Sequence, residues 1–260
     1  MHLKLVQFGL MDAPRLLIAH GLFGSARNWG VLAKRLSRNF CVTAVDMRNH
    51  GESPWSESHS YDDLAKDLAS IVVDTGQPAH VIGHSMGGKA AMVLALRHPQ
   101  LIDRLVIADI APVSYDHTQA HLVQAMNAVD LTRVTNRTDA DRQLAAYVED
   151  ATTRAFLLQS LDVSTASWRL NLATLDRDMP KILSFPAIDG QFEGPTLFLS
   201  GGASDYVQPE HRARIRQLFP SARFAKIKDA GHWLHAEKPR EFEETVRSFL
   251  NADVSSDADR

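Results

Sequence analysis

Ser85 lies between Gly83 and Gly87 in the pattern Gly-x-Ser-x-Gly, with a short apolar run before it and a helix-forming run after it. This setting is typical of a nucleophile elbow, a sharp turn from a strand into a helix that exposes a serine hydroxyl. We expect Ser85 to have a positive φ, at a cost of about 1–3 kcal/mol. The glycines would remove Cβ atoms that clash where helix and strand meet. The chemistry that this pattern favours is nucleophilic attack by Ser85.

A serine hydroxyl is a poor nucleophile at neutral pH and needs a neighbouring base. Among the 12 histidines, His232 lies just after the last expected strand and late in the chain. That position fits the chain order Ser…acid…His that accompanies this kind of elbow. His235 is its nearest rival, but three residues further on it would point elsewhere. His20 and His84 belong to glycine-rich loops, and we expect them to hold loop geometry.

The negative charge that develops during such an attack needs two backbone N–H donors. Met86, the residue after the nucleophile, offers one of them. The loop after the first central strand begins with His20 and Gly21 and offers the other at Leu22. We therefore expect an oxyanion hole formed by the N–H groups of Leu22 and Met86.

Strands that alternate with helices must position these residues. Buried apolar runs predict strands at 15–19, 40–45, 79–83, 104–109, 195–200 and 223–227, with an edge strand at 3–8. Helical patterns lie at 28–36, 61–75, 86–98, 209–218 and 239–250. This alternation predicts an α/β fold with a mainly parallel central sheet and helices on both faces.

The loops that carry the candidate residues should share one edge of the sheet, because they follow the carboxyl ends of parallel strands. These loops are 20–25, 46–54, 83–88, 109–113, 201–207 and 229–235. We expect this edge to bring Ser85 and His232 together. Asp46 and Arg48 are expected to brace the edge by hydrogen bonds rather than to clamp a substrate.

The alternation stops after Pro112. From 117 to 182 the sequence shows helical periodicity without a clear strand. We therefore expect one core domain made of residues 1–112 and 191–260, with a helical cap at 113–190 inserted between two parts of its sheet. Such a cap is best explained as a lid that shapes a pocket.

Composition narrows the class of protein. The chain has 260 residues, of which 45% are hydrophobic and 23% charged, as in ordinary globular proteins. A net charge of −3 gives no broad attraction to nucleic acid or anionic membranes. The single cysteine, Cys41, excludes an intramolecular disulfide. We see neither a signal peptide nor an apolar stretch long enough to span a membrane, and expect a cytoplasmic protein. The sequence does not predict an oligomeric state.

Six stretches, spread over nearly the whole chain, are similar to those of a known family. They are His20-Gly-Leu-Phe-Gly24, Asp46-Met-Arg-Asn-His-Gly51 with Ser53, Gly83-His-Ser-Met-Gly-Gly88, Asp109-Ile-Ala-Pro-Val113, Trp168-Arg-Leu-Asn171 and Gly231-His-Trp-Leu-His-Ala-Glu-Lys-Pro239. In this order they resemble the α/β-hydrolases, and the YbfF-like esterase branch in particular. The resemblance implies a serine hydrolase with a Ser–acid–His triad, small-molecule ester substrates, and neither a cofactor nor a metal.

The acid of that triad can be sought in two places. Many α/β-hydrolases carry it in a pattern resembling Gly-x-x-Asp-x-x-Val, which points to the segment 201–207. Counting forward from Gly202 reaches Asp205, whereas counting forward from Gly201 or back from Val207 reaches Ser204. Two of the three anchors therefore place a serine at the usual acid position.

The YbfF-like branch instead carries an aspartate at the position of Asp109, at the end of the strand after the elbow helix. We therefore predict Asp109 as the partner of His232. Ser204 would be a second hydrogen-bond partner, and Asp205 is the alternative acid.

These residues favour hydrolysis of carboxylic esters with short to medium acyl chains, and thioesters would suit the same machinery. The alternatives on the same triad are C–C bond hydrolysis, perhydrolysis and acyl transfer, because a fold does not determine its chemistry. A further alternative is a non-catalytic protein that keeps the pocket for binding. Haloalkane dehalogenation is disfavoured, because it needs a carboxylate where Ser85 stands.

Overall fold

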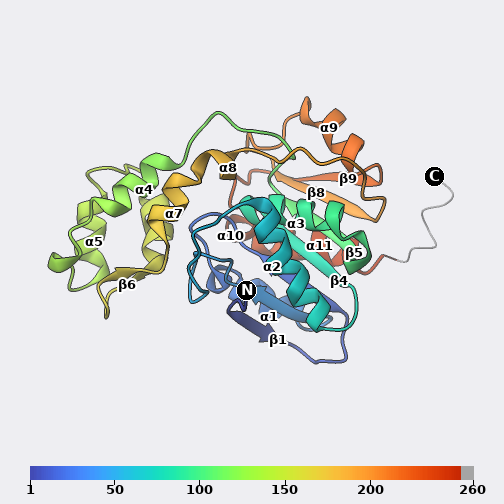
Figure 1. Cartoon of the computed structure of the whole chain (residues 1–260), viewed down its shortest axis with the longest axis horizontal. Helices are drawn as coiled ribbons and strands as arrows, with labels where there is room; N and C mark the ends of the chain where they lie inside the picture. Colours follow the sequence, from blue (N-terminus) through green and yellow to red (C-terminus); the bar gives the residue numbers. More distant parts are fainter. Residues whose placement is uncertain (253–260) are drawn as a thin grey trace.

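A computed structural model describes residues 1–252 of the chain. Its centre is a seven-stranded sheet with the strand order β1-β3-β2-β4-β5-β8-β9. The strands are β1 (Leu5–Phe8), β2 (Arg15–Ala19), β3 (Cys41–Val45), β4 (Ala79–His84), β5 (Ile102–Ala108), β8 (Thr196–Gly201) and β9 (Ala222–Ile227). Only the edge strand β1 runs antiparallel to its neighbour. The predicted α/β class, with a mainly parallel sheet, is confirmed (Figure 1).

Helices cover both faces of the sheet. One hydrophobic cluster packs β2 and β4 against α1 (Gly30–Leu36) and α11 (Pro239–Leu250). The cluster on the other face involves α2 (Tyr61–Asp74), α3 (Met86–Arg97) and α9 (His211–Leu218). Each central strand contributes side chains to both clusters, because successive side chains point to opposite faces of the sheet. In β2, Leu16 and Ile18 belong to the first cluster, and Leu17 and Ala19 belong to the second.

The helix α2 illustrates how local sequence sets an element. Ser60 caps it by accepting a hydrogen bond from the Asp63 N–H, and acidic residues in the first turn complement the helix dipole. Leu64, Leu68 and Val72 recur every four residues and are buried. The expected apolar face is therefore the face that packs against the sheet.

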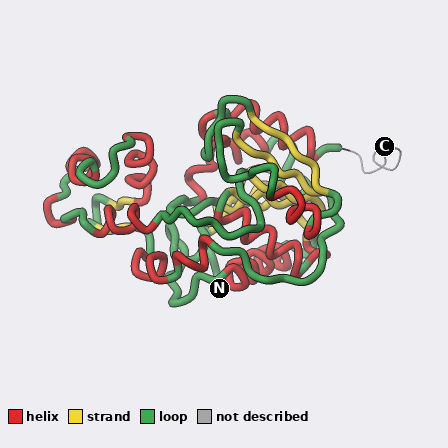
Figure 2. Tube along the Cα trace, turned by 90° about the horizontal axis from the view of Figure 1, so that it is seen from above, coloured by secondary structure: helices red, strands yellow, loops and turns green. Residues whose placement is uncertain are grey.

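Between β5 and β8 the chain is mostly helical. It contains α4 (Ala120–Asn127), α5 (Arg137–Leu144), α6 (Ala151–Leu157), α7 (Leu172–Arg177) and α8 (Met179–Leu183). Figure 1 shows α4, α5 and α7 to one side of the central sheet, and the view from above in Figure 2 also separates this mainly helical part from that sheet. We call residues 113–190 the insertion segment.

The insertion segment also contains two short antiparallel strands, β6 (Leu161–Asp162) and β7 (Ser167–Trp168). The expectation that residues 117–182 hold no strand was therefore wrong. Each strand is two residues long, too short for the alternation by which strands are recognised. The turn between them is held by the Asp162 carboxylate, which accepts hydrogen bonds from the N–H and hydroxyl of Ser164.

No helix within residues 1–252 is long and apolar enough to cross a membrane.

Candidate active site

Ser85 occupies a strained turn between β4 and α3. Its backbone has φ 52° and ψ −120°, and its N–H donates to the Ala108 carbonyl at 3.1 Å. A Cβ on Gly83 would lie 2.4 Å from the Gly87 carbonyl oxygen, and one on Gly87 would lie 2.4 Å from the Ala19 carbonyl oxygen. The positive φ and the need for glycine on both sides are as expected, because strand and helix approach too closely for a side chain.

A continuous chain of hydrogen bonds links Ser85, His232 and Asp109. The His232 Nε2 atom lies 3.0 Å from the Ser85 hydroxyl oxygen, and the His232 Nδ1 atom lies 2.7 Å from Asp109 Oδ2. Because Asp109 is an acceptor when ionised, His232 donates its Nδ1–H and presents Nε2 as the acceptor for the serine proton. The sheet edge brings these residues together although 147 positions separate Ser85 from His232.

Asp109 is fully buried and lies directly after β5, with φ 52°. Its Oδ1 atom accepts the Gly201 N–H at 2.9 Å, and its Oδ2 atom also accepts the Ser204 hydroxyl. Asp205 is exposed and accepts a hydrogen bond from the Gln208 amide at 3.2 Å. The structure therefore places Asp109 against His232, bonds Ser204 to Asp109 and not to His232, and leaves Asp205 outside.

The turn that carries Leu22 is held from beneath by a neutral histidine. His20 Nδ1–H donates to the Gly21 carbonyl at 2.8 Å, and its Nε2 atom accepts the Met47 N–H at 2.9 Å. Burial lowers the pKa of His20 to about 4, which keeps the ring neutral and suited to both bonds. Leu22 lines the same pocket as Ser85 and Met86. As the first residue of α3, Met86 has an N–H with no acceptor inside its helix.

The loop after β3 braces the sheet edge. The Asp46 carboxylate accepts the Ala26 N–H at 2.7 Å and the Glu52 N–H at 2.8 Å. Arg48 Nε donates to the buried carboxylate of Asp67 at 2.6 Å. Gly51 has φ 61°, and a Cβ there would lie 2.1 Å from Asp46 Oδ2. The interpretation of Asp46 and Arg48 as a brace is thus the one that the contacts support.

The pocket above Ser85 combines the sheet edge with the insertion segment. The insertion segment contributes Tyr115, His117, Gln119, Leu122, Phe156, Ile182 and Leu183. Two contacts join the walls: the rings of Phe156 and Trp233 lie 5.2 Å apart, and Asn28 donates to the Gln159 amide oxygen at 2.6 Å. Within the described chain, no aspartate or glutamate lines this pocket. The lining therefore presents no carboxylate to a group attached to the atom that Ser85 would attack, while Lys89 and several histidines also line it.

Comparison with known proteins identifies the family. Residues 14–239 match the α/β hydrolase fold family. The chain belongs to the α/β-hydrolases. This hydrolase is 42% identical to the mouse sn-1-specific diacylglycerol lipase ABHD11, over 94% of this chain and 85% of that protein. It is 39% identical to esterase YbfF of Escherichia coli, over 91% and 92% of the two chains.

A solved marine microorganism esterase superimposes on the hydrolase with a TM-score of 0.91 and 34% identity, over 95% of this chain and 99% of that one. The resemblance to the YbfF-like branch is thereby confirmed, and the protein is a hydrolase of the esterase and lipase type. No group of three or more His, Cys, Asp or Glu residues within positions 1–252 could hold a metal ion.

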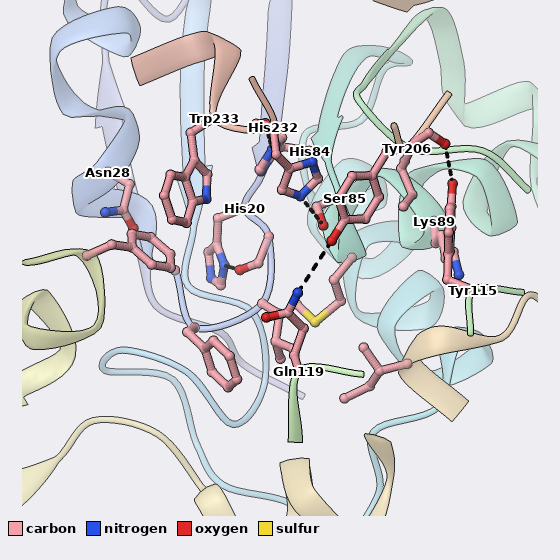
Figure 3. A pocket seen from close by; sticks show the side chains of 18 of the residues that line it. His20, Asn28, His84, Ser85, Lys89, Tyr115, Gln119, Tyr206, His232 and Trp233 are labelled. Carbon is pink, nitrogen blue, oxygen red and sulfur yellow. Dashed lines mark hydrogen bonds between the residues drawn. The ribbon is translucent and has the colours of Figure 1, made fainter. Parts of the chain in front are cut away.

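Two residues of this hydrolase's pocket escaped the sequence analysis. The Tyr206 ring stacks on His232, with centroids 3.8 Å apart and an interplanar angle of 18°. Lys89 is almost fully buried, with its ammonium 4.8 Å from the centroid of the Tyr115 ring. Figure 3 shows Tyr206 beside Ser85 and His232, with Lys89 and Tyr115 further along the same side. Neither belongs to a spaced motif, and no signal in the sequence pointed to their contacts.

Proposed function

We propose that the protein is a serine esterase that cleaves carboxylic esters of short to medium acyl chains through an acyl-enzyme. The observation that carries this proposal is the hydrogen-bond chain from Ser85 through His232 to the buried carboxylate of Asp109. The family membership and the relatives named as esterases or lipases support it. Thioesters with the same acyl groups would react by the same steps.

In the proposed mechanism, Ser85 attacks the ester carbonyl carbon while His232 Nε2 takes the hydroxyl proton. Asp109 keeps the imidazole in the Nδ1–H tautomer and stabilises its charged form. The N–H groups of Leu22 and Met86 bind the oxyanion. His232 then gives this proton to the leaving alkoxide oxygen, and the alcohol departs from the acyl-enzyme. Water, deprotonated by the same histidine, attacks the acyl carbonyl, and His232 returns the proton to the Ser85 oxygen as the acid leaves.

We also propose that residues 1–112 and 191–260, of which 253–260 lie outside the described residues, form the core domain and that the insertion segment is its cap. The cap side chains Leu122 and Phe156 line the pocket opposite the loops of the core. The cap would then decide which acyl and alcohol groups fit. Access to the pocket would depend on the contacts of Phe156 with Trp233 and of Asn28 with Gln159.

The test compares wild type with Ser85→Ala on p-nitrophenyl esters from acetate to laurate and on the matching acyl thioesters. We expect a burst of nitrophenol with wild type and a loss of turnover with Ser85→Ala, with Ser37→Ala, at the far end of α1, as the matched control. Labelling by a fluorophosphonate should occur at Ser85 alone. Full esterase activity in Ser85→Ala would contradict the mechanism, and an unlabelled Ser85 would favour a non-catalytic binding protein.

A further inference from the structure

His50 is a fully buried histidine in the loop after β3, and it contacts the turn that carries Leu22. Its Nε2 atom accepts the Phe23 N–H at 3.2 Å, and its Nδ1–H donates to the Arg48 carbonyl at 2.9 Å. Both bonds require the neutral ring with the proton on Nδ1. Burial, together with the neighbouring His20, lowers the pKa of His50 to about 3, so the ring is neutral at physiological pH.

The turn that His50 holds is strained. Phe23 has φ 63°, a conformation that side-chain-bearing residues adopt at a cost of about 1–3 kcal/mol and keep only where neighbours impose it. The peptide before Leu22 is held by its carbonyl, because Gly21 O accepts hydrogen bonds from His20 and from the Gly24 N–H. The peptide after Leu22 is held by its N–H, which donates to His50.

Two successive planar peptides are therefore held, the first by bonds within the turn and the second by His50 from another loop, and the direction of the Leu22 N–H follows from their orientation. His20 lines the pocket, but His50 does not. His50 thus lies behind the turn, where it can affect the oxyanion only through the backbone that it holds.

The insertion segment in turn holds His50. The Asn171 N–H donates to the Asn49 carbonyl at 3.0 Å, and the Gly51 N–H donates to the Arg169 carbonyl at 2.8 Å. Between these bonds, His50 and Leu170 pair as a short antiparallel bridge. The backbone around His50 is therefore pinned by residues 169–171, which lie far along the chain.

We propose that His50 is a positioning residue that aims the Leu22 N–H at the oxyanion through its hydrogen bond to Phe23. Residues 169–171 hold His50 in place, so the insertion segment contributes to transition-state stabilisation as well as to the pocket wall. This inference rests on the proposed esterase function, because an oxyanion hole has a role only if Ser85 forms a tetrahedral adduct.

The test replaces His50 with two amides of different reach. In His50→Gln the amide oxygen can occupy the position of Nε2 and accept the Phe23 N–H. In His50→Asn the shorter amide reaches only the position of Nδ1. Both side chains are neutral and polar, so they differ mainly in whether the bond to Phe23 is restored.

We expect His50→Asn to lower kcat by up to about 100-fold, the loss that a misplacement of about 1 Å can cause. It should weaken binding of a trifluoromethyl ketone, which forms an oxyanion adduct with serine, by the same factor. Binding of the product acid, which forms no adduct, should stay unchanged. His50→Gln should recover most of both losses.

The control is His80→Asn, in a buried histidine at the opposite end of β4, which should leave kcat and ketone binding unchanged. Asn171→Ala leaves His50 intact but removes the side-chain bond from Asn171 to the Asn49 amide oxygen at 3.1 Å. It should weaken ketone binding in the same direction, which provides a second measurement if His50→Asn fails to fold. Thermal unfolding of every variant reports damage to the fold.

The inference would be overturned if wild type and His50→Asn bound the ketone equally well. It would also be overturned if His50→Asn and His50→Gln lost the same ketone affinity and both also bound the product acid more weakly. If wild type forms no ketone adduct and Ser85 is not labelled by a fluorophosphonate, the proposed esterase function itself has failed. A normal adduct in wild type with unaffected His50 variants would refute only the role of His50.

Discussion

Asp109 is a buried carboxylate whose charge must be balanced by hydrogen bonds. Three donors surround it: the Gly201 N–H, the Ser204 hydroxyl and the His232 Nδ1–H. A buried charge without such partners would be strongly disfavoured. Ser204 and Gly201 therefore supply hydrogen bonds that stabilise the Asp109 carboxylate at a position with no exposure to water.

The competing acids can be separated by single substitutions. Asp109→Asn should lower kcat by up to about 10⁴-fold, because an amide that donates to His232 favours the wrong imidazole tautomer. Ser204→Ala removes a hydrogen bond to the Asp109 carboxylate, worth about 1.5–3 kcal/mol, and should lower kcat about tenfold or more. Asp205→Asn should leave kcat unchanged, because Asp205 is exposed and bonds only to Gln208 among the described residues.

Steady-state kinetics on purified variants, with circular dichroism to verify folding, measures these effects. The assignment of Asp109 would be refuted by a mild Asp109→Asn variant together with an inactive Asp205→Asn variant.

At the scale of elements, α3 does more than present Ser85. Lys89, in its first turn, donates to the carbonyls of Leu183 at 2.7 Å and Ser184 at 2.8 Å. These carbonyls lie where α8 ends and the chain returns towards β8. The nucleophile helix is therefore bonded directly to the end of the insertion segment, and burial lowers the pKa of the Lys89 ammonium to about 7.

This shift predicts a pH-dependent stability. Lysine in the unfolded chain keeps a pKa of 10.5, so between about pH 7 and pH 10.5 the unfolded state binds more protons than the folded state. The free energy of unfolding should therefore rise with pH in that window, by up to about 1.4 kcal/mol per unit from this group. Lys89→Met lacks this contribution, so its stability relative to wild type should be greatest at pH 7 and should decline as pH rises.

Urea unfolding at several pH values measures that difference, with the exposed Lys34→Met as the control for loss of a lysine. Lys89→Met also leaves two carbonyls without their donor. This lowers the free energy of unfolding by the same amount at every pH and does not change how the difference from wild type varies with pH. A difference between wild type and Lys89→Met that does not vary with pH would contradict a neutral Lys89 in the folded protein.

At the scale of the whole molecule, a cluster of neutral histidines lies beneath the carboxyl edge of the sheet. Burial lowers the pKa of His20 to about 4 and the pKa values of His50, His59 and His235 to about 3. His20 and His50 contact each other, as do His50 and His59. Protonating any one of them would place an additional positive charge in an apolar interior.

We therefore predict that the protein loses stability as pH falls below 6.5, the pKa of these groups in the unfolded chain. The stability that these neutral histidines contribute is complete above pH 6.5. It is lost as the pH falls towards their folded-state pKa values of about 3 to 4, because the unfolded state binds more protons than the folded state in that range. Each histidine should contribute up to about 1.4 kcal/mol per pH unit.

Chemical unfolding between neutral pH and about pH 5 measures the slope of the free energy of unfolding against pH. This slope gives the number of protons taken up on unfolding. His50→Gln should reduce the slope by about one proton. A free energy of unfolding that stays constant over this range would contradict the prediction.

The sequence by itself determined the elements and the elbow. Strands such as β2 and helices such as α2 were predictable because the spacing of apolar residues is visible within one short stretch of sequence. That spacing also determines which side of the element is buried. The conformation of Ser85 was predictable because the spacing of Gly83 and Gly87 is also local. The strands β6 and β7 were not predictable, because two residues are too few to show a period.

The family resemblance pointed to Asp109 as the partner of His232, but only the tertiary structure shows the contacts that hold this acid in place. Along the chain, Asp109 and Asp205 were both candidates, and only the pairing of β5 with β8 places Gly201 and Ser204 against Asp109. The contact of His50 with Phe23 was equally hidden, because its two residues lie in different loops. Such contacts depend on which strands pair in the sheet and on where the insertion segment packs. Neither can be predicted from a local sequence pattern.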